Sequence, residues 1–299
     1  MNKGVVSVLV AYLIWGLYPF YFHAMQHVAP TEIVIHRVLW TFALLAVYLF
    51  CSRRWRWIQK AITDRRTVAV FLMSSVLITA NWSTYTYAIV TNQTLEASLG
   101  YFMNPLVSVL LGTVFLKEKL NKAQMLAIVF ACAGVMWVTF KQGEFPALGL
   151  TLALSFGFYG LVRKMAPLGS LEGLTLETAF AFPVALLATF YFAGNGDLTF
   201  VHGTSWDKFW LIMAGPITTI PLILFAYGLK QVPYSTVGFI QYLSPTMVFF
   251  IGLFFFGEEL QVDCLIGFIL IWAGVLIFVG ENFFRSHSGY RTEFNQLSK

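Results

Sequence analysis

Long apolar segments alternate along this chain with short stretches that hold most of its charged and turn-forming residues. The hydrocarbon core of a bilayer is about 30 Å thick, and a helix needs about 20 apolar residues to cross it. Ten segments fit this requirement, so the pattern predicts an all-α integral membrane protein with ten transmembrane helices. The predicted spans are residues 4–23, 31–51, 68–90, 94–116, 122–140, 147–165, 171–193, 207–229, 233–256 and 262–281.

Lysine and arginine are concentrated in alternate connections between these spans. If the N-terminus is cytoplasmic, sixteen of the nineteen basic residues fall on the inner side, and Lys141 and Lys208 alone fall outside. Arg37 is left within a span. Because cytoplasmic loops carry an excess of Lys and Arg, the pattern predicts a multi-pass protein with both termini cytoplasmic.

Composition excludes several classes of protein. Only 11% of the 299 residues are charged and 58% are apolar, with a mean hydropathy of +0.73. Soluble domains carry about 25% charged residues, so this chain has no block that could form a catalytic or nucleic-acid-binding domain in water. The net charge of +5 is explained by the basic loops. Its three cysteines show no metal-ligand spacing, and no metal or cofactor is predicted.

The chain contains an internal repeat with an offset of 140 residues. Pro105 matches Pro245 and Gly112 matches Gly252 at this offset, without gaps between them. Apolar composition alone does not readily align Pro and Gly in order, so the repeat predicts a duplicated five-helix unit. The predicted domains are residues 1–140 for the first repeat, 141–281 for the second, and 282–299 for a cytoplasmic tail.

An odd number of helices per repeat has a consequence for topology. The second copy enters the membrane from the opposite side, so the repeats are predicted to be inverted. Inverted repeats recur in secondary transporters, where the substrate site lies near the midplane between the two halves. Two similar units of this kind can exchange conformations, which predicts transport by alternating access.

Several strings point to a known family. They are Ala11-Tyr12-Leu13-Ile14-Trp15-Gly16, Glu32-Ile33-Val34-Ile35-His36-Arg37, residues 95–105, residues 158–164 and residues 235–242. With these strings the chain resembles the RarD proteins of the EamA-type branch of the drug/metabolite transporter superfamily. The resemblance implies a ten-helix bacterial inner-membrane carrier, with a central cavity lined mainly by the first, third and fourth helices of each half. Residues 83–87 are more polar than this family pattern. The family's fold is therefore expected to apply to this chain more closely than the family's choice of substrate.

Two charged residues lie inside predicted spans. Arg37 is in the second span, and its counterpart at the 140-residue offset is Glu177 in the seventh. A charge within the bilayer is expected to face a partner or a wet cavity. Three arrangements fit: an Arg37–Glu177 pair across the repeat interface, separate charges at opposite mouths, or snorkelling to the headgroups. His36 lies about 100° around its helix from Arg37, and a packing role or a proton relay is expected for it.

Polar residues form a stripe on the fourth span and on its repeat mate. Tyr101 and Asn104 lie on one face of the fourth span, and Gln241 lies on the ninth. These groups are predicted to bind the polar part of a solute, and a seam of interhelical hydrogen bonds is the alternative. Pro105 and Pro245 each remove a backbone hydrogen bond, which predicts hinges or static kinks.

Aromatic side chains within and beside the family strings are predicted to line the route of the solute. The third span adds Asn81, which fits the family pattern together with the tryptophan that follows it. Glu96, at the outer entrance of the fourth span, is predicted to be a gate or proton-sensitive carboxylate. Glu118 and Glu258 are predicted to cap the helix that follows each. The aromatic candidates are Tyr12, Trp15, Trp82, Tyr85 and Tyr159.

Three function classes compete. An intramembrane enzyme needs convergent catalytic groups, and the chain offers no paired Asp, Ser–His dyad or zinc helix. A passive channel shares the hydropathy, but an inverted duplication favours a carrier. The sequence therefore predicts a secondary transporter for a small organic metabolite or drug-like solute, with membrane lipids and that solute as its partners. Solute identity, direction, proton coupling and the choice between monomer and homodimer stay open.

Overall fold

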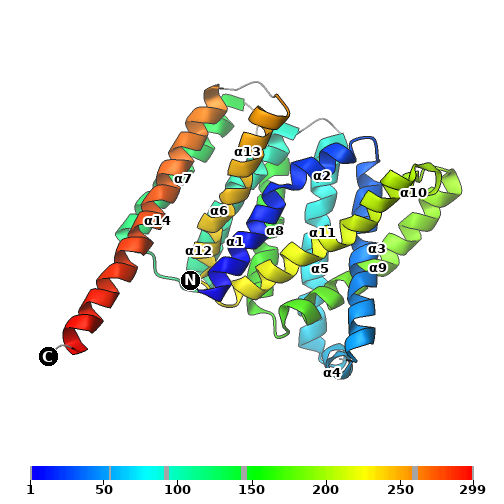
Figure 1. Cartoon of the computed structure of the whole chain (residues 1–299), viewed down its shortest axis with the longest axis horizontal. Coiled ribbons are helices and arrows are strands. Elements are labelled where there is room, and N and C mark those ends of the chain that lie inside the picture. Colours follow the sequence, from blue (N-terminus) through cyan, green and yellow to red (C-terminus); the bar gives the residue numbers. More distant parts are fainter. Residues whose placement is uncertain (1, 54, 91–93, 143–146, 258–261, 298–299) are drawn as a thin grey trace.

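In a computed structural model, the described part of the chain is a bundle of α-helices joined by short connections (Figure 1). The structure describes residues 2–53, 55–90, 94–142, 147–257 and 262–297. The helices are α1 (Lys3–Gly16), α2 (Tyr18–Ala24), α3 (Pro30–Ser52), α4 (Arg56–Thr63), α5 (Arg65–Val90), α6 (Thr94–Phe115), α7 (Lys122–Gln142), α8 (Ala147–Met165), α9 (Ser170–Asn195), α10 (Thr199–His202), α11 (Ser205–Leu229), α12 (Tyr234–Gln241), α13 (Leu243–Phe255) and α14 (Val262–Leu297).

The helices have the length and surface expected in lipid. Within the described residues, seven helical segments are long and apolar enough to cross a membrane, and residues 100–115 and 265–281 form shorter apolar helices. Large side chains such as Phe140 and Phe190 point outward, where a protein in water would bury them. The chain is an all-helical membrane protein, and the count of ten spans stays a prediction.

Two predicted spans are each divided into two helices. The first is broken at Leu17, which separates α1 from α2, and Pro19 occupies the first turn of α2. The ninth is broken at Tyr242, between α12 and α13, and Pro245 lies in the first turn of α13. Proline has no N–H to donate and its ring clashes with the preceding turn, which accounts for both breaks. The repeat mate α6 continues through Pro105 without a break.

Most of the helix packing joins one half of the chain to the other. Helix α1 packs on α11 and α6 on α8 in the middle of the molecule, while α7 pairs with α14 at one edge and α3 with α9 at the opposite edge (Figure 1). Gly134 permits the α7–α14 contact, because an added Cβ would lie 2.6 Å from the carbonyl oxygen of Gly267. Small residues of this kind let membrane helices approach closely. The halves are therefore interlocked.

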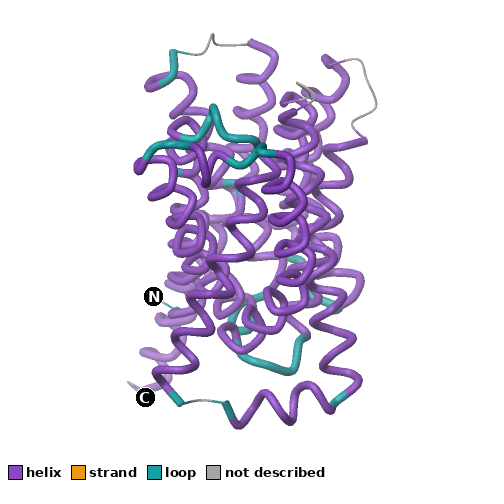
Figure 2. The backbone as a smooth tube through the Cα atoms, turned by 90° about the vertical axis from the view of Figure 1, so that its right-hand side faces the viewer, coloured by secondary structure: helices purple, strands orange, loops and turns teal. Residues whose placement is uncertain are grey.

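The connections gather at the two ends of the bundle, as Figure 2 shows. Helix α4 follows the α3 span, and α10 follows α9 at the corresponding place in the second half. The two short helices lie at opposite ends of the bundle, and both chain termini lie toward the end that carries α4 (Figure 1). Helix α14 continues to Leu297, so most of the predicted tail is helical.

Arg163, within the predicted span 147–165, lies in the last turn of α8 and is only 1% exposed. The prediction for Glu118 is wrong. Glu118 does not cap the helix that follows it. Its carboxylate accepts hydrogen bonds from the backbone N–H groups of Tyr234 and Ser235, so it caps α12 in the other half. Glu258 lies outside the described residues.

Candidate functional site

A cavity of about 660 Å³ lies between the two halves of the chain. Helices α1, α2, α3, α5 and α6 contribute to its wall from the first half, and α8, α11, α12, α13 and α14 from the second. Pockets for drug-sized molecules have volumes of about 300–1,000 Å³. The wall includes Pro245, which the sequence predicted as a hinge, and these predicted binding residues: Tyr12, Trp15, Arg37, Asn81, Trp82, Tyr85, Tyr101, Asn104 and Gln241.

Arg37 is held on the cavity wall by two neighbours and is 8% exposed. Its Nε donates a hydrogen bond of 3.0 Å to the hydroxyl oxygen of Thr218 on α11. Its Cζ lies 4.3 Å from the centre of the Trp82 ring on α5, a cation–π contact. Three helices thus fix the position of the guanidinium.

A second part of the wall carries uncharged polar groups. Ser108 on α6 lies 3.2 Å from the Oε1 atom of Gln241 on α12, and its hydroxyl donates to that oxygen. The Oδ1 atom of Asn104 and the hydroxyl of Tyr12 are buried, with no hydrogen-bond partner among the described residues. A buried polar group without a partner is costly, and a bound solute is one way to satisfy it.

Asn81 is bound to the neighbouring helix. Its Nδ2 donates to the carbonyl oxygen of Leu152 and to the hydroxyl of Ser155, each at 3.0 Å. Both acceptors are on α8, so this side chain joins α5 to the second half of the protein. Asn81 contacts the cavity, but its amide hydrogens are already used.

An aromatic cluster forms the apolar side of the cavity. The ring centres of Tyr12 and Trp15 lie 5.0 Å apart on α1, and Trp15 lies 5.8 Å from Phe156 and 5.4 Å from Phe225. Across the cavity, the rings of Tyr85 and Tyr101 lie 5.9 Å apart. These rings offer flat apolar faces to the hydrocarbon part of a solute.

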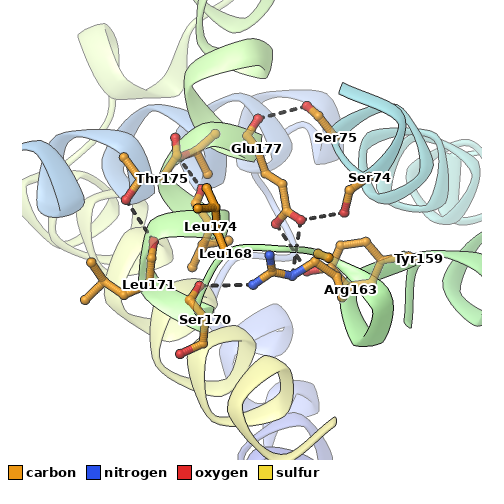
Figure 3. Close-up of polar contacts among 12 residues, drawn as sticks. Ser74, Ser75, Tyr159, Arg163, Leu168, Ser170, Leu171, Leu174, Thr175 and Glu177 are labelled. Carbon is orange, nitrogen blue, oxygen red and sulfur yellow. Dashed lines mark hydrogen bonds and ion pairs between the residues drawn. The ribbon is translucent and has the colours of Figure 1, made fainter. Parts of the chain in front are cut away.

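Glu177 and Arg163 form a buried ion pair behind this wall, with 2% and 1% of their side chains exposed (Figure 3). The Oε1 of Glu177 lies 3.3 Å from the Nε of Arg163 and accepts a 2.5 Å hydrogen bond from Ser74. Its Oε2 accepts a 3.4 Å hydrogen bond from Tyr159. The Nη2 of Arg163 donates to the carbonyl oxygen of Ser170, which fixes the guanidinium against the start of α9.

A small cavity of about 10 Å³ lies beside Glu177. Tyr159, Glu177 and Trp82 all line it, and Trp82 also lines the central cavity. A volume of about 10–15 Å³ holds a single water molecule. The small cavity and the large one share the lining residues Ile78, Trp82 and Leu222, so these side chains form the wall between them.

The structure corrects two expectations about the site and agrees with a third. Of the three arrangements considered for Arg37 and Glu177, the ion pair between them is not formed, because Glu177 pairs with Arg163 and Arg37 binds Thr218. Tyr159 is fully buried beside Glu177 and does not line the central cavity. His36 faces away from Arg37, as its position on the helix indicates, and its Nδ1 accepts a 3.0 Å hydrogen bond from Trp40. The side chain of Glu96 lies outside the described residues.

Lysine side chains close the bundle at the end that carries α4. The Nζ of Lys164 donates to the carbonyl oxygens of Leu229 and Val232, at 2.7 and 2.5 Å. The Nζ of Lys230 donates in return to the carbonyl oxygens of Ala166 and Leu168. Partial burial, and then the charge of Arg163, lower the pKa of Lys230. We call these two reciprocal contacts the lysine clasp.

Tyr234 adds a further contact near the lysine clasp. Its hydroxyl donates a 2.6 Å hydrogen bond to the carbonyl oxygen of Gly157 on α8. An added Cβ at Gly160 would collide with the same hydroxyl, so the tyrosine needs a glycine there. Together with the hydrogen bonds of Glu118 to the start of α12, these contacts join α8 and the connection after α6 to α12 at that end of the bundle.

Comparison with known proteins decides the family. The model of the EamA-like transporter family matches residues 2–140 and again residues 146–280. The chain belongs to the EamA-like transporter family. Membership confirms the resemblance seen in the sequence and places the chain among transporters, outside the enzymes.

Relatives of this EamA protein match along almost its whole length. The uncharacterized transporter YojE of Bacillus subtilis is 40% identical over 282 residues, with 93% of each chain covered. Protein RarD of Escherichia coli is 37% identical over 278 residues, with 93% of this chain and 94% of RarD covered. A solved crystal structure with 14% sequence identity has a TM-score of 0.68, covering 92% of this chain and 98% of the other. That last likeness concerns the fold alone.

Sequence reasoning about this EamA chain missed three residues of the site. Thr218 binds Arg37, Arg163 binds Glu177, and Lys164 binds the turn between α11 and α12. One signal was available for Arg163. A carboxylate within an apolar span needs a cation, and Arg163 is the basic residue at the end of the preceding span. Nothing in the sequence distinguishes Thr218 from Thr219.

Proposed function

We propose that this EamA protein is a secondary transporter that moves a small organic solute across the bacterial inner membrane by alternating access. The solute binds in the central cavity. One observation carries the proposal: a cavity of about 660 Å³, enclosed by helices of both repeats, combines an aromatic wall with one fixed cation.

The roles of the lining residues follow from their chemistry. Arg37 attracts an anionic group, while Asn104, Gln241 and Tyr101 bind uncharged polar groups. Tyr12, Trp15, Trp82 and Tyr85 pack on the apolar part of the solute. Asn81 and Tyr159 hold α8 and α9 in place around the cavity. Burial of the apolar part supplies affinity, and the few polar groups fix the orientation.

The arrangement of the two halves supports alternating access. The family model matches two segments, residues 2–140 and 146–280, which supports the proposal of one repeat at 1–140, a second at 141–281 and a tail at 282–299. The repeat mates α4 and α10 lie at opposite ends of the bundle, as ten spans in two inverted repeats require (Figure 1). The basic loops then put both termini in the cytoplasm.

The lysine clasp supports a specific state within this cycle. It closes the end that the basic residues assign to the cytoplasm, whereas Tyr101, at the other end of the cavity, is 47% exposed. In the proposed cycle the clasp opens when the cavity turns inward. The breaks beside Pro19 and Pro245, together with Pro105, are the proposed hinges, and Glu177 and Glu96 are proposed to respond to protons or to gate the path.

The test is transport by the purified protein. Solutes that differ between cells lacking the protein and cells overproducing it identify the candidates, which are then measured in proteoliposomes. A carrier gives saturable uptake and counterflow. Flux that rises linearly with concentration identifies a passive channel and overturns the proposal, as does chemical conversion of the solute.

A further inference from the structure

The charge inside the central cavity restricts what it can hold. Arg37 is the one residue carrying a full charge at neutral pH among the described residues that line the cavity. A charge at this depth in a membrane protein is paired or serves a ligand. The group that pairs with Arg37 therefore determines which class of solute the cavity binds.

One carboxylate on the same helix as Arg37 and one on a neighbouring helix have other partners. Glu32, on the same helix, accepts hydrogen bonds from the backbone N–H groups of Thr199 and Phe200 at 2.9 and 2.7 Å. Glu177, on the neighbouring α9, is paired with Arg163. In the part of the chain that the structure describes, no ion pair is formed by Arg37.

The contacts that Arg37 makes leave the N–H groups on its two Nη atoms available to a ligand. A guanidinium has five N–H donors, and the hydrogen bond to Thr218 uses only the one at Nε. The Trp82 ring covers one face of the guanidinium without using a donor. The four N–H groups on the two Nη atoms match the two oxygens of a carboxylate in a bidentate geometry.

The remaining polar groups of the wall are uncharged. The unpartnered Oδ1 of Asn104 and the unpartnered hydroxyl of Tyr12 suit an amide or hydroxyl group on the ligand. An ammonium group bound in the cavity would meet Arg37 and, among the described lining residues, no carboxylate. Burying such a charge without a counter-ion is expensive, which disfavours amines and zwitterions.

We propose that the central cavity selects organic monoanions, whose carboxylate binds the Nη edge of Arg37 while their apolar part lies on the aromatic wall. This inference rests on the proposed function, because the bound anion is taken to be the transported solute. A cavity that binds cationic drugs would instead need an acidic residue in place of the arginine.

The test compares matched ligands that differ only in charge. Binding to the purified protein in lipid nanodiscs is measured by calorimetry for indole-3-acetate, indole-3-acetamide and tryptamine. The same comparison is made for 3-phenylpropionate and hexanoate, each with its amide and its amine. We expect at least one carboxylate to bind about 10-fold or more tightly than its amide, since a charge-assisted hydrogen bond contributes about one such factor. We expect the amines to bind most weakly.

Variants assign this difference to Arg37. Arg37→Gln is expected to abolish the preference for the carboxylate, and Arg37→Lys to keep part of it. Thr218→Val supplies a milder change at the same site, should Arg37→Gln prevent folding. The inference is overturned by an amide that binds as tightly as its carboxylate in every set, by a preference that survives Arg37→Gln, by absence of binding of all three carboxylates, or by equal competition from inorganic phosphate.

Counterflow in proteoliposomes with the same probes separates the two proposals. Binding of a carboxylate that depends on Arg37, without any transport, leaves the anion site standing and contradicts the carrier. Equal transport of carboxylate, amide and amine leaves the carrier standing and contradicts selection of anions.

Discussion

The guanidinium of Arg37 lies 4.3 Å from the centre of the Trp82 ring, and that ring is part of the wall between the central cavity and Glu177. The two buried charges of opposite sign are thus neighbours of one indole without being partners of each other. Arg37 faces the large cavity, whereas Glu177 is neutralised by Arg163. The positive charge of Arg37 is therefore available to bind an anionic solute.

Removing the acceptor of the Arg37 Nε group is expected to weaken binding of anions. Thr218→Val keeps the volume of the side chain and removes the hydroxyl oxygen that lies 3.0 Å from Nε. The guanidinium then loses one of its two fixed contacts, and we expect the affinity for a carboxylate probe to fall about 3- to 10-fold. Calorimetry with indole-3-acetate measures this change.

The adjacent residue offers a matched control. Thr219 is equally buried, but its hydroxyl donates to the carbonyl oxygen of Gly215 in its own helix. Thr219→Val therefore leaves Arg37 untouched and is expected to keep the wild-type affinity. Equal losses in both variants would show that the hydroxyl of Thr218 has no special role.

Neutralising Glu177 is expected to destabilise the protein strongly. Glu177→Gln leaves the guanidinium of Arg163 buried without a counter-ion, and losing one partner of a buried pair costs about 3–5 kcal/mol. The midpoint of thermal unfolding in detergent, followed by circular dichroism, measures the loss. Glu172→Gln, a change near the start of the same helix, is the control and should shift the midpoint little.

A double variant tests the cause of that loss. Arg163→Met combined with Glu177→Gln removes both charges, so we expect it to recover part of the stability that Glu177→Gln loses. If the double variant is as unstable as the sum of the single variants, the two residues do not interact as a pair.

Two asparagines that line the same cavity are expected to behave differently. Asn81→Ala removes the two hydrogen bonds to α8 and should lower stability by about 1 kcal/mol, since such bonds between membrane helices average about 0.6 kcal/mol each. Asn104→Ala removes an unpartnered Oδ1 atom, so it should leave stability unchanged and weaken solute binding. Unfolding midpoints and binding constants of both variants, measured side by side, check this contrast.

Opening of the lysine clasp is expected to loosen one end of the bundle only. Lys164→Met together with Lys230→Met removes hydrogen bonds to four backbone carbonyl oxygens at the end that carries α4. Hydrogen–deuterium exchange measured by mass spectrometry should then rise in residues 229–237, with residues 195–205 at the other end unchanged. Lys208→Met is the control at that other end. Unchanged exchange in residues 229–237 would mean that the clasp does not hold this end closed.

The sequence predicted the class of fold because the bilayer imposes a simple rule on it. Apolar segments of about 20 residues, basic loops and a repeat of Pro and Gly residues are visible in one sequence. The breaks at Leu17 and Tyr242 were harder to locate, because a proline perturbs the turn before it and the neighbouring helices decide whether the helix ends. Pro105 lies in a helix that continues unbroken, so the presence of a proline does not by itself determine where a helix ends.

The sequence indicated which residues belong to the site, but it did not indicate which of them pair with one another. Helical spacing and the family strings identified Arg37, Trp82 and Asn104, which all line the cavity. Which cation neutralises Glu177 depends on how α8 and α9 pack, which the spacing of residues within one segment does not reveal. The role of Glu118 was missed for the same reason, since its partner is the start of α12.

The most direct test of the central claim is the accessibility of the cavity from each face of the membrane. Ser244→Cys places a thiol on the cavity wall, in a chain whose native cysteines at positions 51, 132 and 264 are replaced by serine. A membrane-impermeant maleimide is applied to right-side-out and to inside-out vesicles. We predict labelling from both faces, with labelling from the face that carries α4 increased when Lys164 and Lys230 are changed to Met. Labelling from a single face in every vesicle and variant would contradict alternating access.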